Sequence, residues 1–147
     1  MKEQFKIYIA AYLVLEKDGE ILFLKRANSG FQDGKYSMVS GHFDGNETAE
    51  ECIIREAKEE ANITLELKNL TVVHIMHRFS FDREYIDIYI TCSEWDGEIK
   101  NMEPKKCTDL SWFPIDNLPK STIPEIIFAL DNIKKKKHYS NFGEKNK

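Results

Sequence analysis

The sequence has few cysteines and prolines, and each shortage argues against a class of protein. Its 147 residues include four prolines and three cysteines, Cys52, Cys92 and Cys107, with no CxxC pair. An odd number of cysteines at long spacings argues against a disulfide framework and against a structural zinc site. Free thiols fit the reducing cytoplasm, and a cytoplasmic protein is therefore expected.

Long hydrophobic runs and an excess of positive charge are also missing. The most apolar stretch, Ile7 to Leu15, is shorter than the roughly 20 residues that a membrane-spanning helix needs. A charged turn, Glu16 to Gly19, follows it where a signal peptide would have a small-residue cleavage site. The formal net charge is −4, so no basic field attracts nucleic acid. We expect neither a membrane nor a stable nucleic-acid partner.

The order of predicted elements indicates one α/β (α+β) domain, a mixed sheet flanked by helices. Strands are expected at residues 5–15, 21–24, 36–39, within 63–81, at 85–91 and at 110–113, and helices at about 49–61 and 125–134. Ile86, Ile88 and Ile90 alternate with polar or aromatic residues, which predicts a half-exposed strand. The domain is expected to span residues 1–137, and residues 138–147 to form a polar tail that frays.

The first predicted helix has a recognisable start and end. Thr48 is followed three residues later by Glu51, which is the spacing of a capping box, so Thr48 is the expected N-cap. Asn62 stands where the helix should end, and Asn tolerates the left-handed backbone of such a position. The helix is therefore expected to run to about Ala61.

Three glutamates of this helix lie where surface charges are not expected. At about 100° per residue, Glu56 and Glu60 point along the same face as the apolar side chains, and Glu59 lies at its edge. Inward carboxylates are costly unless a positive group meets them, and two carboxylates four residues apart repel each other. A divalent cation would remove both costs, so the helix predicts a metal site.

The stretch from Gly41 to Ile63, GHFDGNETAEECIIREAKEEANI, resembles the Nudix box of the Nudix hydrolase superfamily. The spacing agrees throughout, and one family glycine is replaced by Asn62. Beyond the box, the run Trp95-x-Gly97, Glu103-Pro104 and Trp112-Phe113 is similar to the MutT-like branch. The resemblance implies a Nudix-type α/β/α sandwich over most of the chain.

The resemblance also implies the metal ligands. Glu56, Glu59 and Glu60 match the glutamates that hold Mg²⁺ or Mn²⁺ in the family, and Gly41 matches the glycine whose carbonyl approaches the metal. Mg²⁺ prefers hard oxygen ligands, so the residue types fit. Two histidines, His74 and His77, lie three apart in a predicted strand and so on opposite faces, which argues against a second shared metal site.

Further roles follow from the same resemblance. Arg55 matches the arginine that orients the glutamates, Glu47 a structural acid, and Glu103 an additional acid on a mobile loop. The general base could be Glu59, Glu60 or Glu103, and the sequence does not choose among them.

Substrate contacts are predicted from cations and from one loop residue. Lys25, Arg26 and Lys35 flank the box from the preceding strand and loop, where they could bind phosphate. Thr122 stands where MutT-like proteins often place an Asn that reads the purine. A Thr hydroxyl cannot make the paired contacts of an amide, so the base preference stays open.

Three functions compete at this point. The first is hydrolysis of a nucleoside triphosphate to a monophosphate and pyrophosphate by a monomer or homodimer. The second is a Nudix activity on ADP-ribose, a dinucleoside polyphosphate or capped RNA. The third is a non-catalytic nucleotide sensor. No proline occurs between Ile63 and Pro104, where ADP-ribose enzymes often have one, and the retained glutamates argue against a sensor. The first function is therefore preferred.

Overall fold

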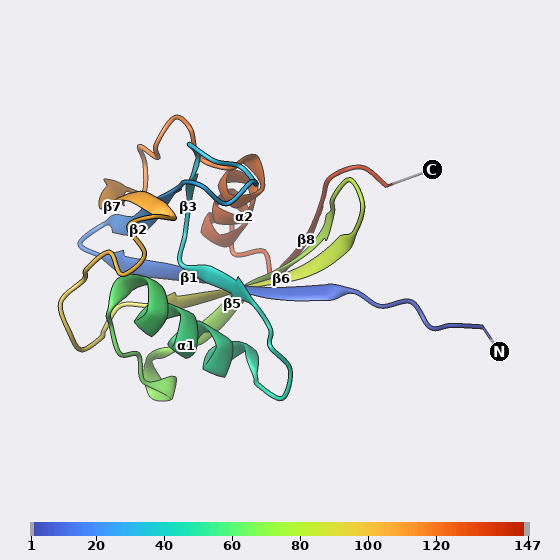
Figure 1. Ribbon diagram of the computed structural model, residues 1–147, viewed down its shortest axis with the longest axis horizontal. Helices are drawn as coiled ribbons and strands as arrows, with labels where there is room; N and C mark the ends of the chain where they lie inside the picture. Colours follow the sequence, from blue (N-terminus) through green and yellow to red (C-terminus); the bar gives the residue numbers. More distant parts are fainter. Residues whose placement is uncertain (1, 146–147) are drawn as a thin grey trace.

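Two helices lie on opposite faces of a mixed sheet in the computed structural model, which describes residues 2–145 (Figure 1). The predicted mixed sheet flanked by helices is thereby confirmed. The elements in chain order are β1 Tyr8–Lys17, β2 Glu20–Arg26, β3 Tyr36–Ser37, β4 Ser40–His42, α1 Ala49–Ala61, a 3₁₀ turn Leu67–Asn69, β5 Thr71–Phe79, β6 Glu84–Cys92, β7 Cys107–Pro114, α2 Pro124–Lys134 and β8 Tyr139–Phe142. Within residues 2–145, neither α1 nor α2 combines the length and apolar character of a membrane-spanning helix.

Strand β1 lies at the centre of the sheet and explains the apolar run near the start of the chain. The strand order is β3-β2-β1-β6-β5-β8, with β6 parallel to β1. Successive side chains of a strand point to opposite faces. Leu13 and Leu15 therefore enter the core under α1, whereas Val14 enters the core under α2. Because both faces of β1 are covered, the strand is apolar without alternation.

The turn after β1 has the backbone that its sequence predicts. Asp18 and Gly19 both have positive φ angles, 53° and 77°. Two positive φ angles in a row fit a two-residue hairpin turn that matches the twist of the strands. The prediction was wrong at the other end of the strand, which begins at Tyr8 rather than Phe5, and Phe5 is 72% exposed.

Strand β4 brings the residues that precede α1 beside the central strand β1. The predicted strand 36–39 is split: β3 ends at Ser37, and β4 then pairs antiparallel with β1, placing Gly41 opposite Ala11. Gly41 therefore stands between the central strand and α1.

Strand β6 is more buried than its sequence predicts. Tyr85, Asp87 and Tyr89 alternate with isoleucines, which indicated a half-exposed strand, but all three are buried. The prediction was wrong because β6 is an interior strand between β1 and β5, and the core under α2 covers the face that carries Tyr89.

The expectation of a frayed tail from residue 138 is also wrong for part of that segment. Tyr139–Phe142 form β8, which pairs parallel with β5. The ring of His74 bonds the Lys137 carbonyl oxygen and the Ser140 hydroxyl, both at 2.7 Å, and so ties this segment to the sheet. His77 instead bonds Glu84 at 2.8 Å, so the two histidines have separate partners. Residues 146 and 147 of the predicted tail lie outside the described residues.

Candidate active site

Helix α1 begins and ends where the sequence predicts. The Thr48 hydroxyl accepts a hydrogen bond from the Glu51 amide at 3.1 Å, and the Glu51 carboxylate accepts one from the Thr48 amide at 3.0 Å. Asn62 ends the helix with a left-handed φ of 63°. These two caps fix the rotation of the helix. Its second half therefore presents Glu56 and Glu60 toward β4.

Gly41 and Glu56 are in close contact, which explains why position 41 needs a glycine. A Cβ atom built on Gly41 would coincide with the side chain of Glu56, where its nearest neighbours are Oε1, Cδ and Cγ. No other residue leaves space for that carboxylate. The glycine of the box therefore serves a packing role at the site itself.

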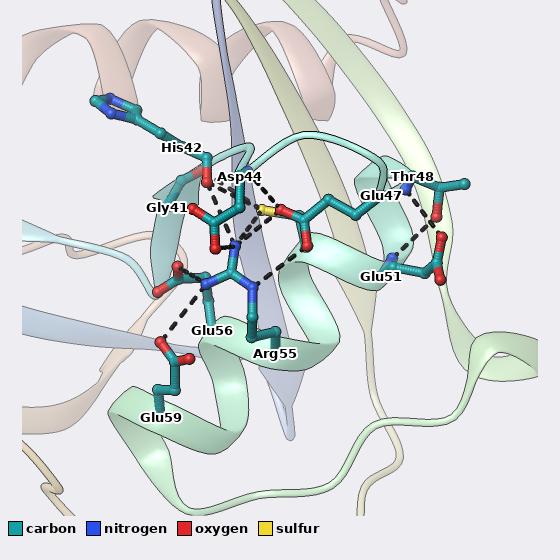
Figure 2. A network of polar contacts seen from close by, with 10 residues as sticks. Gly41, His42, Asp44, Glu47, Thr48, Glu51, Arg55, Glu56 and Glu59 are labelled. Carbon is teal, nitrogen blue, oxygen red and sulfur yellow. Dashed lines mark hydrogen bonds and ion pairs between the residues drawn. The ribbon is translucent and has the colours of Figure 1, made fainter.

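Arg55 connects the acidic side chains of the box, as Figure 2 shows. Its guanidinium pairs with both carboxylate oxygens of Glu47, at 2.9 and 3.3 Å. Its Nη1 pairs with Glu56 Oε1 at 2.7 Å and lies 3.6 Å from Glu59 Oε2. A further ion pair joins Nη2 to Asp44 at 3.4 Å. Arg55 thus contacts two of the three glutamates predicted to bind the metal, and joins them to the loop before α1.

Among residues 2–145, no cation pairs with Glu60 as Arg55 pairs with Glu56. Its Oε2 accepts a hydrogen bond from the Ser40 amide at 3.2 Å. Burial raises the pKa of Glu60 well above its ordinary value, and repulsion from Glu56 and Glu103 adds to this increase. Burial also raises the pKa of Glu56, despite Arg55. Both carboxylates are therefore costly to keep ionised unless a further positive group meets them.

The donor set fits a hard divalent cation. Carboxylates that repel one another beside a backbone carbonyl are what Mg²⁺ or Mn²⁺ would stabilise. Within residues 2–145, no three Asp, Glu, His or Cys side chains converge on one point, and Glu56 and Glu59 turn toward Arg55. The residues that would hold the ion are Glu56, Glu59, Glu60 and the carbonyl of Gly41.

A small cavity joins Glu103 to this site. Arg26, Glu60, Glu103 and Lys106 are among the residues that line a space of about 180 Å³. The backbone holds the loop there, because the Met102 amide donates to the Glu60 carbonyl at 3.3 Å. The structure therefore places Glu103 beside Glu60 of α1 in one cavity, and its role as an additional acid stays a prediction.

A larger cavity of about 510 Å³ opens on the other side of Arg26, along β4, β5 and β6. Ser40, Gly41 and His42 form its boundary with the box, and its cationic lining comes from Arg26, Arg78 and Arg83. The aromatic rings of Tyr12, Phe31 and Tyr85 also line it, and one carboxylate, that of Asp82, lies among the cations. Apart from Arg26, sequence reasoning assigned none of these cationic and aromatic residues to the site. No sequence signal marked Arg78 and Asp87, because their burial follows from the interior place of β6, which the sequence did not predict.

Two predicted substrate contacts lie elsewhere. Thr122 is buried, and its hydroxyl donates to the Pro119 carbonyl at 2.6 Å, so that donor is already used. Lys35 is half-buried beside β3. Neither residue lines the two cavities described above, whereas Arg26 lines both.

Comparison with known proteins decides the family. The sequence model of the NUDIX domain matches residues 5–130 of the chain. The chain belongs to the Nudix hydrolase family. The predicted membership of the Nudix superfamily is thereby confirmed. The stretch from Gly41 to Ile63, which includes α1, is the Nudix box of this protein.

Relatives and solved structures agree with this assignment. The chain is 30% identical to an ADP-ribose pyrophosphatase of Methanocaldococcus jannaschii over 122 residues, covering 80% of this chain and 70% of that protein. It is 32% identical to the NAD-capped RNA hydrolase NudC of Chromobacterium violaceum over 114 residues, covering 78% of this chain but only 41% of that protein. The fold is like that of a MutT NUDIX hydrolase from Burkholderia pseudomallei, with a TM-score of 0.79, 24% identity, and coverage of 86% and 98%.

Replacing Gly41 by Ala in this Nudix protein is expected to impair the site while leaving the fold intact. The new methyl group would displace the Glu56 side chain, which can rotate away without moving the backbone. We expect the apparent affinity for Mg²⁺ to fall about tenfold or more, as for a disturbed metal environment. Titrating activity with Mg²⁺ measures this change. A similar substitution at Gly45, whose Cβ would meet open space but whose φ is +89°, should cost stability without changing the Mg²⁺ dependence.

Proposed function

We propose that this Nudix protein hydrolyses nucleoside triphosphates to a nucleoside monophosphate and pyrophosphate in the presence of a divalent metal ion. Two cavities of different character meet at Arg26, and this division supports the proposal. The larger cavity has aromatic walls, which suit a base and its sugar. The smaller one, of about 180 Å³, is lined by the charged side chains of Arg26, Lys106, Glu60 and Glu103, which suits phosphate groups and a cation rather than a second sugar.

Charge distribution supports the same placement of the substrate. Arg26 and Lys106 line the small cavity beside Glu60 and Glu103. Cations bind phosphate oxygens, whereas the carboxylates would repel them without a metal ion between. The triphosphate would therefore lie across the Nudix box, with its nucleoside in the large cavity.

The residues of the box would divide the chemistry. A Mg²⁺ or Mn²⁺ ion, when bound by Glu56, Glu59, Glu60 and the Gly41 carbonyl, supplies charge neutralisation and an activated water. Arg26 and Lys106 would hold the leaving phosphates. Glu103 stands on a loop at the edge of this site and, like Glu59 and Glu60, is a candidate to accept the proton of the attacking water.

The names of the relatives support a second candidate, hydrolysis of ADP-ribose or of an NAD-type cap. Both compounds contain a diphosphate between two nucleoside or sugar groups. The second group would need space beyond the small cavity of about 180 Å³. The triphosphate therefore remains the preferred substrate class.

Incubation with a substrate panel tests both candidates. With Mg²⁺, we expect the four common nucleoside triphosphates to give monophosphate and pyrophosphate, and ADP-ribose or NAD-capped RNA to react more slowly. Chromatography of the phosphate-containing products identifies the bond that breaks. EDTA should abolish the reaction. Preferred turnover of ADP-ribose would establish the second candidate, and no turnover by the folded protein would contradict both.

A further inference from the structure

Arg78 lies in the wall of the large cavity and differs from the other cations there. Its Nε donates to Asp87 Oδ2 at 2.6 Å, and its Nη2 donates to Oδ1 at 3.1 Å. The Arg78 side chain is 9% exposed and that of Asp87 is fully buried. This is a paired, two-point contact between β5 and β6, and Asp87 itself does not line the cavity.

The pair also has a fixed orientation. The Arg78 guanidinium lies 4.0 Å from the centre of the Tyr85 ring, so it is held between a carboxylate and an aromatic face. A guanidinium has five N–H donors, and the contacts with Asp87 use two of them. Three donors, including both on Nη1, are left for another partner. Arg78 also lines the cavity, so its side chain borders the space that a bound nucleoside would occupy.

The charge of this group decides what it would bind. Asp87 neutralises Arg78, and a neutral pair attracts a phosphate less than a free cation does. Arg26 is better placed for phosphate, because it lines the cavity that contains Glu60 and Glu103. Arg78 lines only the aromatic cavity. Its free donors therefore suit uncharged acceptors on a base rather than phosphate oxygens.

We propose that Arg78 determines base specificity by donating hydrogen bonds to two adjacent acceptors on the substrate base, such as O6 and N7 of guanine. This proposal rests on the proposed function only in placing the nucleoside in the large cavity. A guanidinium matches that pair of acceptors, whereas adenine presents a donor beside N7. Asp87 would act as a positioning residue, because it fixes the plane of the guanidinium without touching the base.

Substrate analogues test the contact without altering the protein. We expect the wild-type kcat/KM to be about tenfold lower for 7-deaza-GTP, which lacks the N7 acceptor, than for GTP. Inosine triphosphate keeps O6 and N7 and should behave like GTP at this contact. Equal kcat/KM for GTP and 7-deaza-GTP would overturn the proposal.

A variant identifies the residue responsible. Arg78→Lys should remove the difference between GTP and 7-deaza-GTP, mainly through KM, because the contact is already made in the bound ground state. Arg83→Lys is the matched comparison, since Arg83 lines the same cavity but lies at its exposed rim. That variant should affect both substrates equally. Persistence of the difference in Arg78→Lys would overturn the assignment.

Two further points keep the test decisive. If Arg78→Lys does not fold, the wild-type comparison of analogues still decides whether N7 is read. If GTP is not hydrolysed, calorimetric binding of GMP and 7-deaza-GMP replaces turnover. If GMP bound more tightly than 7-deaza-GMP and Arg78→Lys removed that difference, base recognition by Arg78 would stand although the proposed function had failed. Equal binding of the two nucleotides would overturn the base-recognition proposal.

Discussion

Replacing Glu60 by Gln is expected to lower turnover by about 10³-fold, which is on the order of 4 kcal/mol of transition-state stabilisation. Of the three glutamates Glu56, Glu59 and Glu60, the last has its charge least balanced by the protein, because it bonds the Ser40 amide whereas the other two lie beside Arg55. Glu60 would therefore contribute more to the affinity for a metal ion than Glu56, whose carboxylate is already paired with Arg55.

The same substitution should make the metal-free protein more stable. Gln can still accept the Ser40 hydrogen bond, but it removes a buried charge that Glu56 and Glu103 repel. We therefore expect a higher unfolding temperature for Glu60→Gln than for wild type in EDTA. In Mg²⁺, the order should reverse or the gap should narrow, because the ion stabilises only a protein that binds it.

Glu50→Gln is the control for this experiment. Glu50 belongs to the first turn of the same helix and takes no part in the Arg55 network. Its substitution should change neither turnover nor the response to Mg²⁺. Thermal unfolding with and without Mg²⁺, together with turnover at saturating substrate, separates these effects. Near-normal turnover in Glu60→Gln would refute its assignment as a metal ligand.

The part of the site that the sequence predicted is the part built within one helix. Local signals fixed α1: Thr48 and Glu51 cap its start, and Asn62 ends it. Once those ends are known, the helical period places Glu56 and Glu60 on one face. The close contact between Gly41 and the Glu56 side chain shows that this face of α1 is the one that packs against β4.

The substrate cavity could not be predicted in the same way, because it depends on pairing between distant strands. A register shift between Val72 and His74 sets which residues of β5 face inward. That shift and the interior place of β6 bring Arg78 and Asp87 together. Neither feature has a local sequence signal. Thr122 was assigned by analogy with a loop position, and the loop turns its hydroxyl toward Pro119 instead.

Arg55→Lys is expected to reduce both stability and turnover. A lysine can keep the charge, but a single ammonium cannot pair with both oxygens of Glu47 and also reach Glu56. We expect the free energy of unfolding to fall by about 1–2 kcal/mol, since the network is partly exposed. Turnover should fall by about 10²-fold because Glu56 loses the donor that orients it. Lys58→Arg, on the exposed side of the same helix, should change neither quantity.

A double-mutant cycle with Glu47→Gln isolates the structural part of this effect. Both substitutions weaken the same interaction, since Arg55→Lys loses its two-point geometry and Glu47→Gln loses its negative charge. The two single losses in unfolding free energy should therefore sum to more than the loss in the double variant, by about 1 kcal/mol. Arg55 holds the pKa of Glu47 below its ordinary value of 4.5. Glu47 thus contributes stability above that pH, and the contribution is lost as the pH falls through the lowered pKa. The coupling should therefore be present at pH 7 and vanish in acid. Coupling that persists after Glu47 is protonated would show that Arg55 stabilises the helix through other contacts.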